Sequence, residues 1–310
     1  MALNNVLNDK EFAQISKRRI HISSICKQMG LSYEGKDTEI YGLNFCDRKS
    51  EYDHILTFIT SEKYIKHINR NDKIRCVVLT RELFEIARRN ETKEITYIIT
   101  DCPETIFYKI HEFLYANTQF YDKFLFDARI GEKCRISPKA DISQGVVIGN
   151  HVSIGDFTTI LPGVVIEDYC EVGCNCIIGC DGFQLIKSHE ENRLIQHTGR
   201  VRICEGTSIS NYVTVCRSLF DGFTYIGRNV KIDNLVSISH NLSIGDGTVI
   251  VSGAFFCGGC QVGKNVWVGP NSTIMNKVKI GDYGKIGIGS VVISDVKEGT
   301  TVFGNPARRL

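Results

Sequence analysis

The sequence has no long hydrophobic segment and no strong excess of one charge. It contains no run of about 18 apolar residues, the length that a membrane-spanning helix needs. The longest apolar stretch, Val249–Cys257, is short and includes Ser252 and Gly253. The net charge of +2 comes from mixed signs, which gives no electrostatic case for binding nucleic acid or an anionic membrane. We therefore expect no transmembrane segment and no nucleic-acid partner.

The N-terminal sequence lacks the apolar core of a signal peptide. Thirteen cysteines are an odd number, and many of them occur at repeat positions, so we expect small buried thiols in a reducing cytoplasm instead of disulfides. The pairs Cys174–Cys176 and Cys257–Cys260 have the spacing of metal half-sites, but no histidine stands at zinc spacing from them. These features predict a cytoplasmic protein without a bound metal.

Isoleucine or valine recurs at every sixth residue through most of the C-terminal half. The 23 hexads form three runs, at 136–178, 203–215 and 226–292, and only Phe256 departs from the rule. A period of six matches neither a helix nor an alternating strand, and it is typical of a hexapeptide β-helix with three hexads in each coil. Glycine often follows the aliphatic residue, where a corner favours a residue without a Cβ. The pattern predicts a left-handed parallel β-helix of seven to eight coils over about 128–304, with the aliphatic residues facing its axis.

Residues 1–127 lack this period and predict a small α/β domain, followed by a β-helix domain over 128–310. The expected helices and strands of the first domain are Lys10–Gly30 and Ile106–Leu114 as helices, with Ile40–Asn44, His54–Phe58, Arg75–Leu79 and Ile95–Ile99 as strands. Two irregularities interrupt the β-helix. The 25-residue step from Ile178 to Ile203 predicts a polar loop extruded over about 180–201, a natural wall for a binding site. The 11-residue step from Val215 to Ile226 is one residue short of two hexads.

His240 is the strongest candidate for a catalytic group. Of eight histidines, only His151 and His240 lie within repeats, and His151 is interpreted as a solvated corner residue. A lone outward histidine is usually an ordinary polar side chain, but Asp233, Asn234 and Asn241 lie on the same coils as His240. Histidine can accept a proton from an amine or a hydroxyl at neutral pH, so this neighbourhood favours a general base.

Four segments of the sequence resemble one known family. They are LTFITSEKY (56–64), DGF (181–183), HTGRVRI (197–203) and KIDNLVSISHN (231–241). They are similar to the UDP-3-O-acylglucosamine N-acyltransferases of lipid A synthesis, and the similarity extends from about Gly30 to about Gly289. It implies a homotrimer with active sites between neighbouring β-helices, in which a sugar amine attacks an acyl thioester directly. It also implies that His240 is the catalytic base and that the Gly258 N–H is the oxyanion donor.

The resemblance also assigns residues for binding the acceptor. Phe58 and Tyr64 fall on an aromatic pair that sandwiches uracil, although alone they would be a strand core residue and a helix aromatic. Ser61 stands where the family commonly has asparagine, which leaves room for a thymidine-linked sugar. The remaining expected substrate contacts are Asp233, Asn234, Asn241 and His197, the last of which is the next candidate for the base.

Two departures from the family concern the acyl donor. Lys277 replaces a second histidine of the family's site, and we expect no counterpart of the C-terminal helices that bind acyl carrier protein in the lipid A enzymes. Its last coils, including Trp267 and the Gly304–Ala307 segment, instead resemble sugar and serine acetyltransferases that use acetyl-CoA. We expect Trp267 in the donor site, with CoA phosphates meeting the cations Lys277, Lys285, Arg308 and Arg309. The alternative is that these four are solvated surface charges.

The sequence thus favours an N-acyltransferase that moves an acetyl or hydroxyacyl group from a short acyl-CoA to a UDP- or dTDP-linked amino sugar. Such an enzyme would serve lipopolysaccharide, O-antigen or capsule synthesis. One alternative is a lipid A N-acyltransferase that uses a 3-hydroxyacyl carrier protein. A second is O-acyl transfer, because one histidine suits both nucleophiles, and a third is a non-catalytic trimeric scaffold.

Overall fold

The computed structural model describes residues 19–48, 50–187 and 192–310. The chain divides into two compact units. One contains the described residues up to Asp122 together with Gln184–Gln196, and the other contains Lys123–Phe183 and His197–Leu310. Among the helices of the described residues, none has both the length and the apolar character needed to cross a bilayer.

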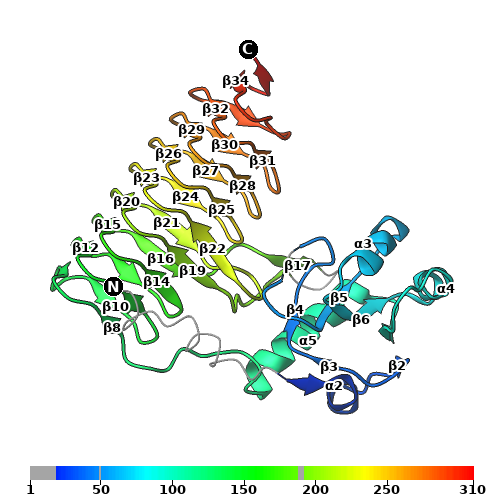
Figure 1. Cartoon of the computed structure of the whole chain (residues 1–310). Helices are drawn as coiled ribbons and strands as arrows, with labels where there is room; N and C mark the ends of the chain where they lie inside the picture. The colour runs from blue at the N-terminus through cyan, green and yellow to red at the C-terminus, as the bar shows by residue number, and fades with distance from the viewer. Residues whose placement is uncertain (1–18, 49, 188–191) are drawn as a thin grey trace. The chain divides into compact units, whose positions relative to one another are not determined.

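The second unit is the predicted left-handed parallel β-helix, seen in Figure 1 as a stack of triangular coils. Its three flat sides are parallel sheets, which we call faces 1, 2 and 3. Face 1 consists of β10 (Asp141–Ile142), β13 (Thr159–Ile160), β16 (Ile177–Cys180), β21 (Thr214–Cys216), β24 (Ser237–Ile238), β27 (Phe255–Phe256), β30 (Thr273–Ile274) and β33 (Val291–Val292). Face 2 consists of β8 (Arg129–Ile130), β11 (Val147–Ile148), β14 (Val164–Ile166), β19 (Arg200–Ile203), β22 (Phe223–Ile226), β25 (Ser243–Ile244), β28 (Gln261–Val262) and β31 (Lys279–Ile280).

Face 3 is the longest of the three sheets. It consists of β9 (Arg135–Ile136), β12 (Ser153–Ile154), β15 (Glu171–Val172), β20 (Ser208–Ile209), β23 (Lys231–Ile232), β26 (Val249–Ile250), β29 (Trp267–Val268), β32 (Lys285–Ile286), β34 (Thr301–Gly304) and β35 (Ala307–Arg309). All of its neighbouring pairs are parallel except the last, in which β35 folds back antiparallel on β34. This hairpin covers the edge of the sheet at the C-terminal end.

The hexad residues point into the core of the β-helix, as the period predicts. Ile232 and Ile244 are among the buried residues, and only the first two hexad residues, Ile136 and Ile142, are partly exposed at the open N-terminal end. Each buried isoleucine or valine removes its side chain from water, which stabilises the fold by about 1.5–3 kcal/mol. The repeated aliphatic position is therefore the main source of stability of this unit.

Both irregularities of the repeat occur where the chain passes from face 1 to face 2, a position that we call the 1–2 corner. Ile178 on face 1 is followed by Ile203 on face 2, and Val215 on face 1 by Ile226 on face 2. Each step advances the chain by a single side of the triangle. The 11-residue step is therefore one hexad with extra residues in its corner.

The first unit contains a five-stranded sheet in the order β2-β7-β6-β5-β4. Strands β4 to β7 are parallel and β2 pairs antiparallel with β7. Its elements in chain order are β1 (Ile20–His21), α2 (Ile22–Met29), β2 (Tyr33–Glu34), β3 (Glu39–Ile40), β4 (Gly42–Leu43), β5 (Ile55–Phe58), η1 (Glu62–Tyr64), α3 (Ile65–Arg70), β6 (Ile74–Leu79), α4 (Arg81–Arg89), β7 (Thr96–Ile99) and α5 (Pro103–Asn117).

The predicted helix ending at Gly30 is present, but it begins only at Ile22, because residues 20–21 are extended and pair with β3. The part of that prediction over 10–18 lies outside the described residues. Gly30 has a φ of +64°, the left-handed conformation that ends many helices. The single strand predicted over 40–44 is wrong, because this segment forms two short strands, β3 and β4, that belong to different sheets. The other strands and the helix predicted over 54–114 are present with shifted bounds, while the sequence patterns missed β2, α3 and α4.

The extruded loop carries a short antiparallel hairpin, β17 (Leu185–Lys187) with β18 (Asn192–Leu194). It packs within the first unit against α5. His111 Nε2 lies 2.8 Å from the Gln196 carbonyl oxygen, and the Gln184 side-chain amide donates to the Tyr108 hydroxyl at 3.2 Å. A polar segment predicted as a loop is thus a hairpin held by buried polar groups.

Candidate active site

His240 follows the buried Ile238 on face 1, so it stands at the 1–2 corner one coil after the second insertion. Its side chain is enclosed, and the residue is 8% exposed. Nδ1 lies 2.8 Å from Oδ1 of Asn241. Asn241 adopts a φ of +60°, a left-handed conformation that asparagine tolerates and that turns the chain at this corner.

Two glycines lie close to the His240 ring. A methyl group placed on the Cα of Gly258, at the same corner of the next coil, would lie 2.7 Å from Nε2. A methyl group on the Cα of Gly182 would lie 2.6 Å from Cδ2. Only residues without a Cβ can stand this close to the imidazole. The repeat therefore brings together His240 and Gly258, the two residues for which the family resemblance implies the roles of base and oxyanion donor.

His197 also belongs to this cluster. Its ring meets the His240 ring edge to face, with centroids 5.2 Å apart and planes inclined by 75°. The backbone N–H of His197 donates to Oδ2 of Asp181 at 3.3 Å, and Nε of Arg217 lies 3.5 Å from Oδ1 of the same carboxylate. Partial burial raises the pKa of Asp181, while the His197 N–H and the Arg217 charge act in the opposite direction.

The two insertions at the 1–2 corner supply most of the residues around the His240 ring. The first contains Asp181, Gly182 and His197, and the second begins at Arg217. Arg217 also donates to the Gly179 carbonyl at 2.7 Å and to the Pro162 carbonyl at 2.9 Å, which ties the second insertion to the preceding coils. The extra residues thus form the walls of the histidine cluster.

Asp233 and Asn234 do not join His240 in this unit. They follow Ile232 on face 3 and therefore stand at the corner between faces 3 and 1, the 3–1 corner. Asn234 Oδ1 accepts from the backbone N–H of Asn211 at 3.0 Å, and Asp233 accepts from the Ser252 hydroxyl. The latter bond holds the pKa of the Asp233 carboxyl below its usual value.

Phe58, Ser61 and Tyr64 lie at the carboxyl end of β5, in the first unit. This edge of a parallel sheet is where open α/β folds bind ligands. Phe58 is half-buried among other aromatic rings, with the Phe107 centroid 4.9 Å away, and Tyr64 lies 5.0 Å below the Lys63 ammonium group. Ser61 precedes η1 as its N-cap residue without a capping hydrogen bond from its side chain.

The predicted donor residues occupy two places. Trp267 on β29 is aligned with Lys285 on β32, both project outward from face 3, and Trp267 is 47% exposed. Arg308 is aligned with Phe303 in the terminal hairpin of the same face. Lys277 lies instead at the 1–2 corner, where its N–H donates to the Gly258 carbonyl at 3.0 Å.

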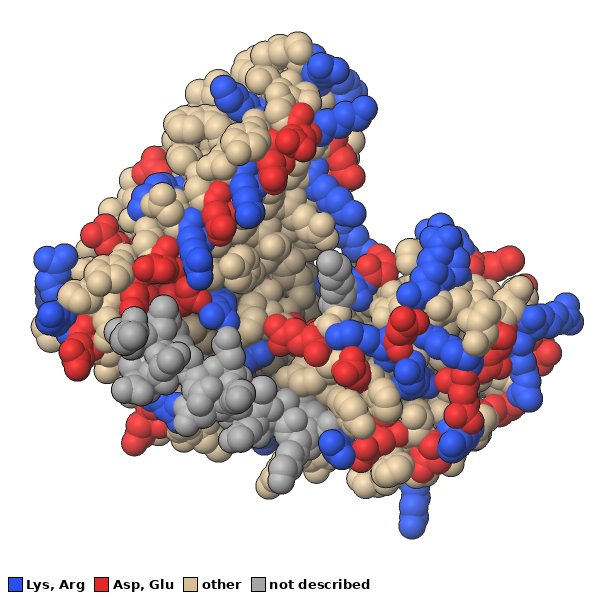
Figure 2. Space-filling view, in the orientation of Figure 1, with Lys and Arg blue, Asp and Glu red and all other residues tan. Residues whose placement is uncertain are grey.

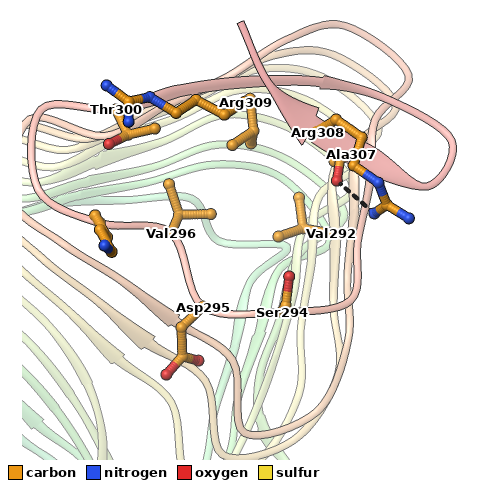
Figure 3. Close-up of a pocket in the computed structure, with 10 residues that line it drawn as sticks. Val292, Ser294, Asp295, Val296, Thr300, Ala307, Arg308 and Arg309 are labelled. Atoms are coloured by element: carbon orange, nitrogen blue, oxygen red, sulfur yellow. Dashed lines mark hydrogen bonds between the residues drawn. The ribbon is translucent and has the colours of Figure 1, made fainter.

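A cavity of about 270 Å³ opens at the C-terminal end of the β-helix. Figure 3 shows Val292 and Val296 pointing into it, with Arg309 crossing its rim and Arg308 turned away toward the Ala307 carbonyl. In Figure 2, Lys and Arg side chains gather at this end of the β-helix, while the coils below carry both signs. Among the described residues, no group of three or more histidine, cysteine or acidic side chains is arranged to hold a metal ion.

Comparison with known proteins agrees with this architecture. The model of the bacterial transferase hexapeptide family (six repeats) matches residues 127–161, 145–180, 223–258 and 259–297. The UDP-3-O-acylglucosamine N-acyltransferase of Campylobacter lari is 29% identical over 264 residues, which cover 79% of this chain and 80% of that protein. The Helicobacter pylori protein of the same name is 27% identical and covers 74% of this chain and 72% of its own length.

A solved structure, the UDP-N-acetylglucosamine acyltransferase from Campylobacter jejuni, superposes with a TM-score of 0.53 at 24% identity, over 59% of this chain and 69% of that chain. At this identity the superposition supports the fold alone. The chain thus has the fold of a left-handed β-helix, matches the bacterial transferase hexapeptide model over 127–180 and 223–297, and is similar over most of its length to proteins named UDP-3-O-acylglucosamine N-acyltransferase.

Proposed function

We propose that this protein transfers an acetyl or hydroxyacyl group from a short acyl-CoA to the amino group of a nucleotide-linked amino sugar. The observation that carries the proposal is the enclosed His240 ring, held at Nδ1 by Asn241 and lying with Nε2 against Gly258. The names of the relatives, UDP-3-O-acylglucosamine N-acyltransferases, support a UDP-sugar as acceptor and an amine as nucleophile.

In the proposed reaction, the sugar amine attacks the thioester carbonyl carbon, and Nε2 of His240 takes the proton that the amine loses. The Gly258 N–H donates to the oxyanion of the tetrahedral intermediate. The carbon–sulfur bond then breaks, and the CoA thiolate leaves as the amide forms. The protonated His240 can return its proton to the thiolate, which completes the cycle. His197, whose ring meets that of His240, would shield the reacting groups from water.

For the acceptor, we propose that Phe58 and Tyr64 stack on the nucleobase, as in the family that the sequence resembles. Both stand at the carboxyl end of β5, where a planar ligand can be bound without disturbing the sheet. Each ring is expected to contribute roughly 1 kcal/mol to binding. Alanine at either position should raise the acceptor KM far more than it lowers kcat, and unchanged acceptor binding in both variants would make them core residues only.

For the donor, we propose that the outer surface of face 3 near the C-terminal end binds CoA. An exposed indole in register with Lys285, and Arg308 farther along the same sheet, combine an apolar ring with cations. A cofactor with a planar base and phosphates needs both. Lys277 and Arg309 lie at the 1–2 corner and at the rim of the end cavity, so their roles in donor binding are separate proposals.

A homotrimer is part of this proposal, because large apolar side chains are exposed together along face 1 and the 3–1 corner. Leu235 is 64% exposed, and Tyr212 and Phe157 are exposed at the same corner on other coils. Phe255 and Ile177 are exposed on face 1 itself. Apolar surface of this extent on a solenoid favours burial against a second copy.

The relatives' names also favour a second candidate, an N-acyltransferase that acts on UDP-3-O-acylglucosamine. For this candidate we propose an acyl carrier protein as the donor, as in the lipid A family that the sequence resembles. The purified protein should therefore be incubated with acetyl-CoA, 3-hydroxyacyl-CoAs or a 3-hydroxyacyl carrier protein, each against UDP- and dTDP-amino sugars. Products are detected by mass spectrometry. Amide formed from a short acyl-CoA alone supports the first proposal, whereas turnover only with the carrier protein supports the second.

The catalytic role of His240 has its own test. His240→Ala should lower kcat by roughly two to four orders of magnitude and leave acceptor affinity nearly unchanged. His151→Ala is the matched control, because His151 is the other repeat histidine and stacks on Tyr169 at another corner, 4.8 Å between centroids. If His240→Ala keeps a large part of the activity, the base lies elsewhere, and His197 becomes the next residue to test.

A further inference from the structure

The second insertion of the 1–2 corner contains a buried serine whose hydroxyl is fully engaged. Ser218 is 1% exposed, and its hydroxyl donates to the Asp221 carbonyl oxygen at 2.5 Å. Its oxygen also accepts from Nδ2 of Asn241. A hydroxyl has one hydrogen, so a serine that donates to a carbonyl can only accept from the asparagine.

The amide of Asn241 is therefore oriented by two independent groups. Its Oδ1 accepts from the backbone N–H of Leu219 at 3.1 Å, and a backbone N–H can only donate. Its Nδ2 faces the accepting oxygen of Ser218. Rotating the amide by 180° would place its NH₂ against the Leu219 N–H and its oxygen against Ser218, so both bonds would be lost at once.

This orientation determines the protonation of His240. The oxygen that Asn241 presents to Nδ1, 2.8 Å away, can only accept, so in the neutral ring the hydrogen is on Nδ1. Nε2 then carries the lone pair on the side of Gly258, where a base must have it. With the amide reversed, its NH₂ would donate to Nδ1 and the hydrogen would move to Nε2, which could no longer accept a proton.

We propose that Ser218 is a positioning residue that holds His240 in the Nδ1–H tautomer through Asn241. The inference rests on the proposed role of His240 as the base, and it goes beyond that role by assigning a purpose to the second insertion. The chain Asp221 carbonyl, Ser218, Asn241, His240 runs from the inserted loop to the catalytic nitrogen. Three residues of one corner loop, Ser218, Leu219 and Asp221, thus act on the base through Asn241.

The tautomer can be observed directly in the unmodified protein. Two-bond ¹H–¹⁵N spectra of protein labelled with ¹⁵N-histidine distinguish Nδ1–H from Nε2–H, and the signals of His240 are those missing from His240→Gln. We expect the Nδ1–H form to predominate at a pH where the ring is neutral. A predominant Nε2–H form would overturn the proposal whatever any variant shows.

Ser218→Ala removes the acceptor of Nδ2, so the reversed amide becomes competitive. We expect a measurable fraction of Nε2–H in its spectrum and a loss of kcat of roughly ten- to a hundredfold, with acceptor KM little changed. Ser272→Ala is the control, since Ser272 is a fully buried serine whose hydroxyl oxygen lies 2.8 Å from the Gly269 carbonyl oxygen and 3.0 Å from that of Gly287, away from His240. It should lower stability without changing the tautomer.

A double variant tests the same chain by rescue. Asn241→Asp supplies a carboxylate, which accepts from Nδ1–H in either orientation and does not need Ser218. The variant that combines Ser218→Ala with Asn241→Asp should therefore return to the Nδ1–H form, and failure to do so would contradict the proposal. The two hypotheses fail separately: an active His240→Ala refutes the base, whereas an Nε2–H ring in the wild type refutes only the positioning.

Discussion

The close contact between Gly258 and His240 predicts a large effect from the smallest possible side chain. In Gly258→Ala, the added methyl group would lie 2.7 Å from Nε2 and 2.8 Å from Cε1, whereas ordinary contact begins near 3.4 Å. The ring must therefore retreat by roughly 0.7 Å. It has little freedom to do so, because Gly182 lies close to Cδ2 of the ring and Asn241 holds Nδ1.

A displacement of this size is sufficient to impair catalysis. Misplacing a catalytic group by about 1 Å can cost roughly a hundredfold in rate, so we expect kcat of Gly258→Ala to fall by roughly ten- to a hundredfold. Crowding in a packed site should also lower the free energy of unfolding by about 1–3 kcal/mol. Alanine keeps the backbone N–H, so the loss would report the position of the base and not the removal of the oxyanion donor.

The assay is amide formation followed by mass spectrometry, with the unfolding free energy measured in urea on the same preparations. Gly173→Ala is the matched control, because its methyl group would lie 2.7 Å from Oδ1 of Asn211 at the 3–1 corner, in a comparable contact away from His240. It should lose stability and keep its kcat. Full activity in Gly258→Ala would refute the geometry on which the proposed base depends.

Three further predictions follow from groups outside the histidine cluster. The Ser252 hydroxyl lowers the pKa of Asp233, so this hydrogen bond stabilises the fold above about pH 4, and its contribution is lost as the pH falls through the lowered pKa. Ser252→Ala should therefore make the free energy of unfolding in urea less dependent on pH in this acid range. The Cys216 thiol lies 3.7 Å from Cys180 and lowers the pKa of Cys180 by hydrogen bonding, whereas the pKa of Cys216 is raised, so iodoacetamide should modify Cys180 first and Cys216→Ala should slow that reaction. Leu235→Lys should shift sedimentation from trimer toward monomer without loss of the β-helix circular dichroism signal, and a wild-type monomer at micromolar concentration would contradict the assembly.

The β-helix was predictable from sequence because the residue that stabilises it, a buried isoleucine or valine, recurs at every sixth position. Each side of each coil places one aliphatic residue against the axis of the β-helix, so the strands have no alternative register. Even Phe256 occupies the same buried position as its neighbours. In the first unit the signal is weaker. Strand β2 is two residues long and α3 six, too short for a period to emerge, so their presence depends on pairing and packing with distant segments.

The site was predictable only in part, because the β-helix separates residues that are close in sequence. Asp233 and His240 are seven positions apart, slightly more than one side of the triangle, so they stand at different corners. Gly258 is farther along the chain but stands at the same corner as His240, since 18 residues complete a coil. In this fold, residues separated by a multiple of 18 positions are therefore closer in space than residues separated by a few positions that lie at different corners.

The same rule explains how the insertions contribute to the site. Extra residues in a solenoid can leave only at a corner, because an insertion within a strand would break the pairing with both neighbouring coils. Both insertions of this chain leave at the 1–2 corner. Successive coils therefore place Asp181, His197, Ser218 and His240 at this one corner of the β-helix. An 11-residue step in a period of six was the signal for Ser218 in the sequence. This step is a corner insertion in the coil directly before that of His240. Interpreted in this way, the step would have indicated that the inserted residues orient the candidate base.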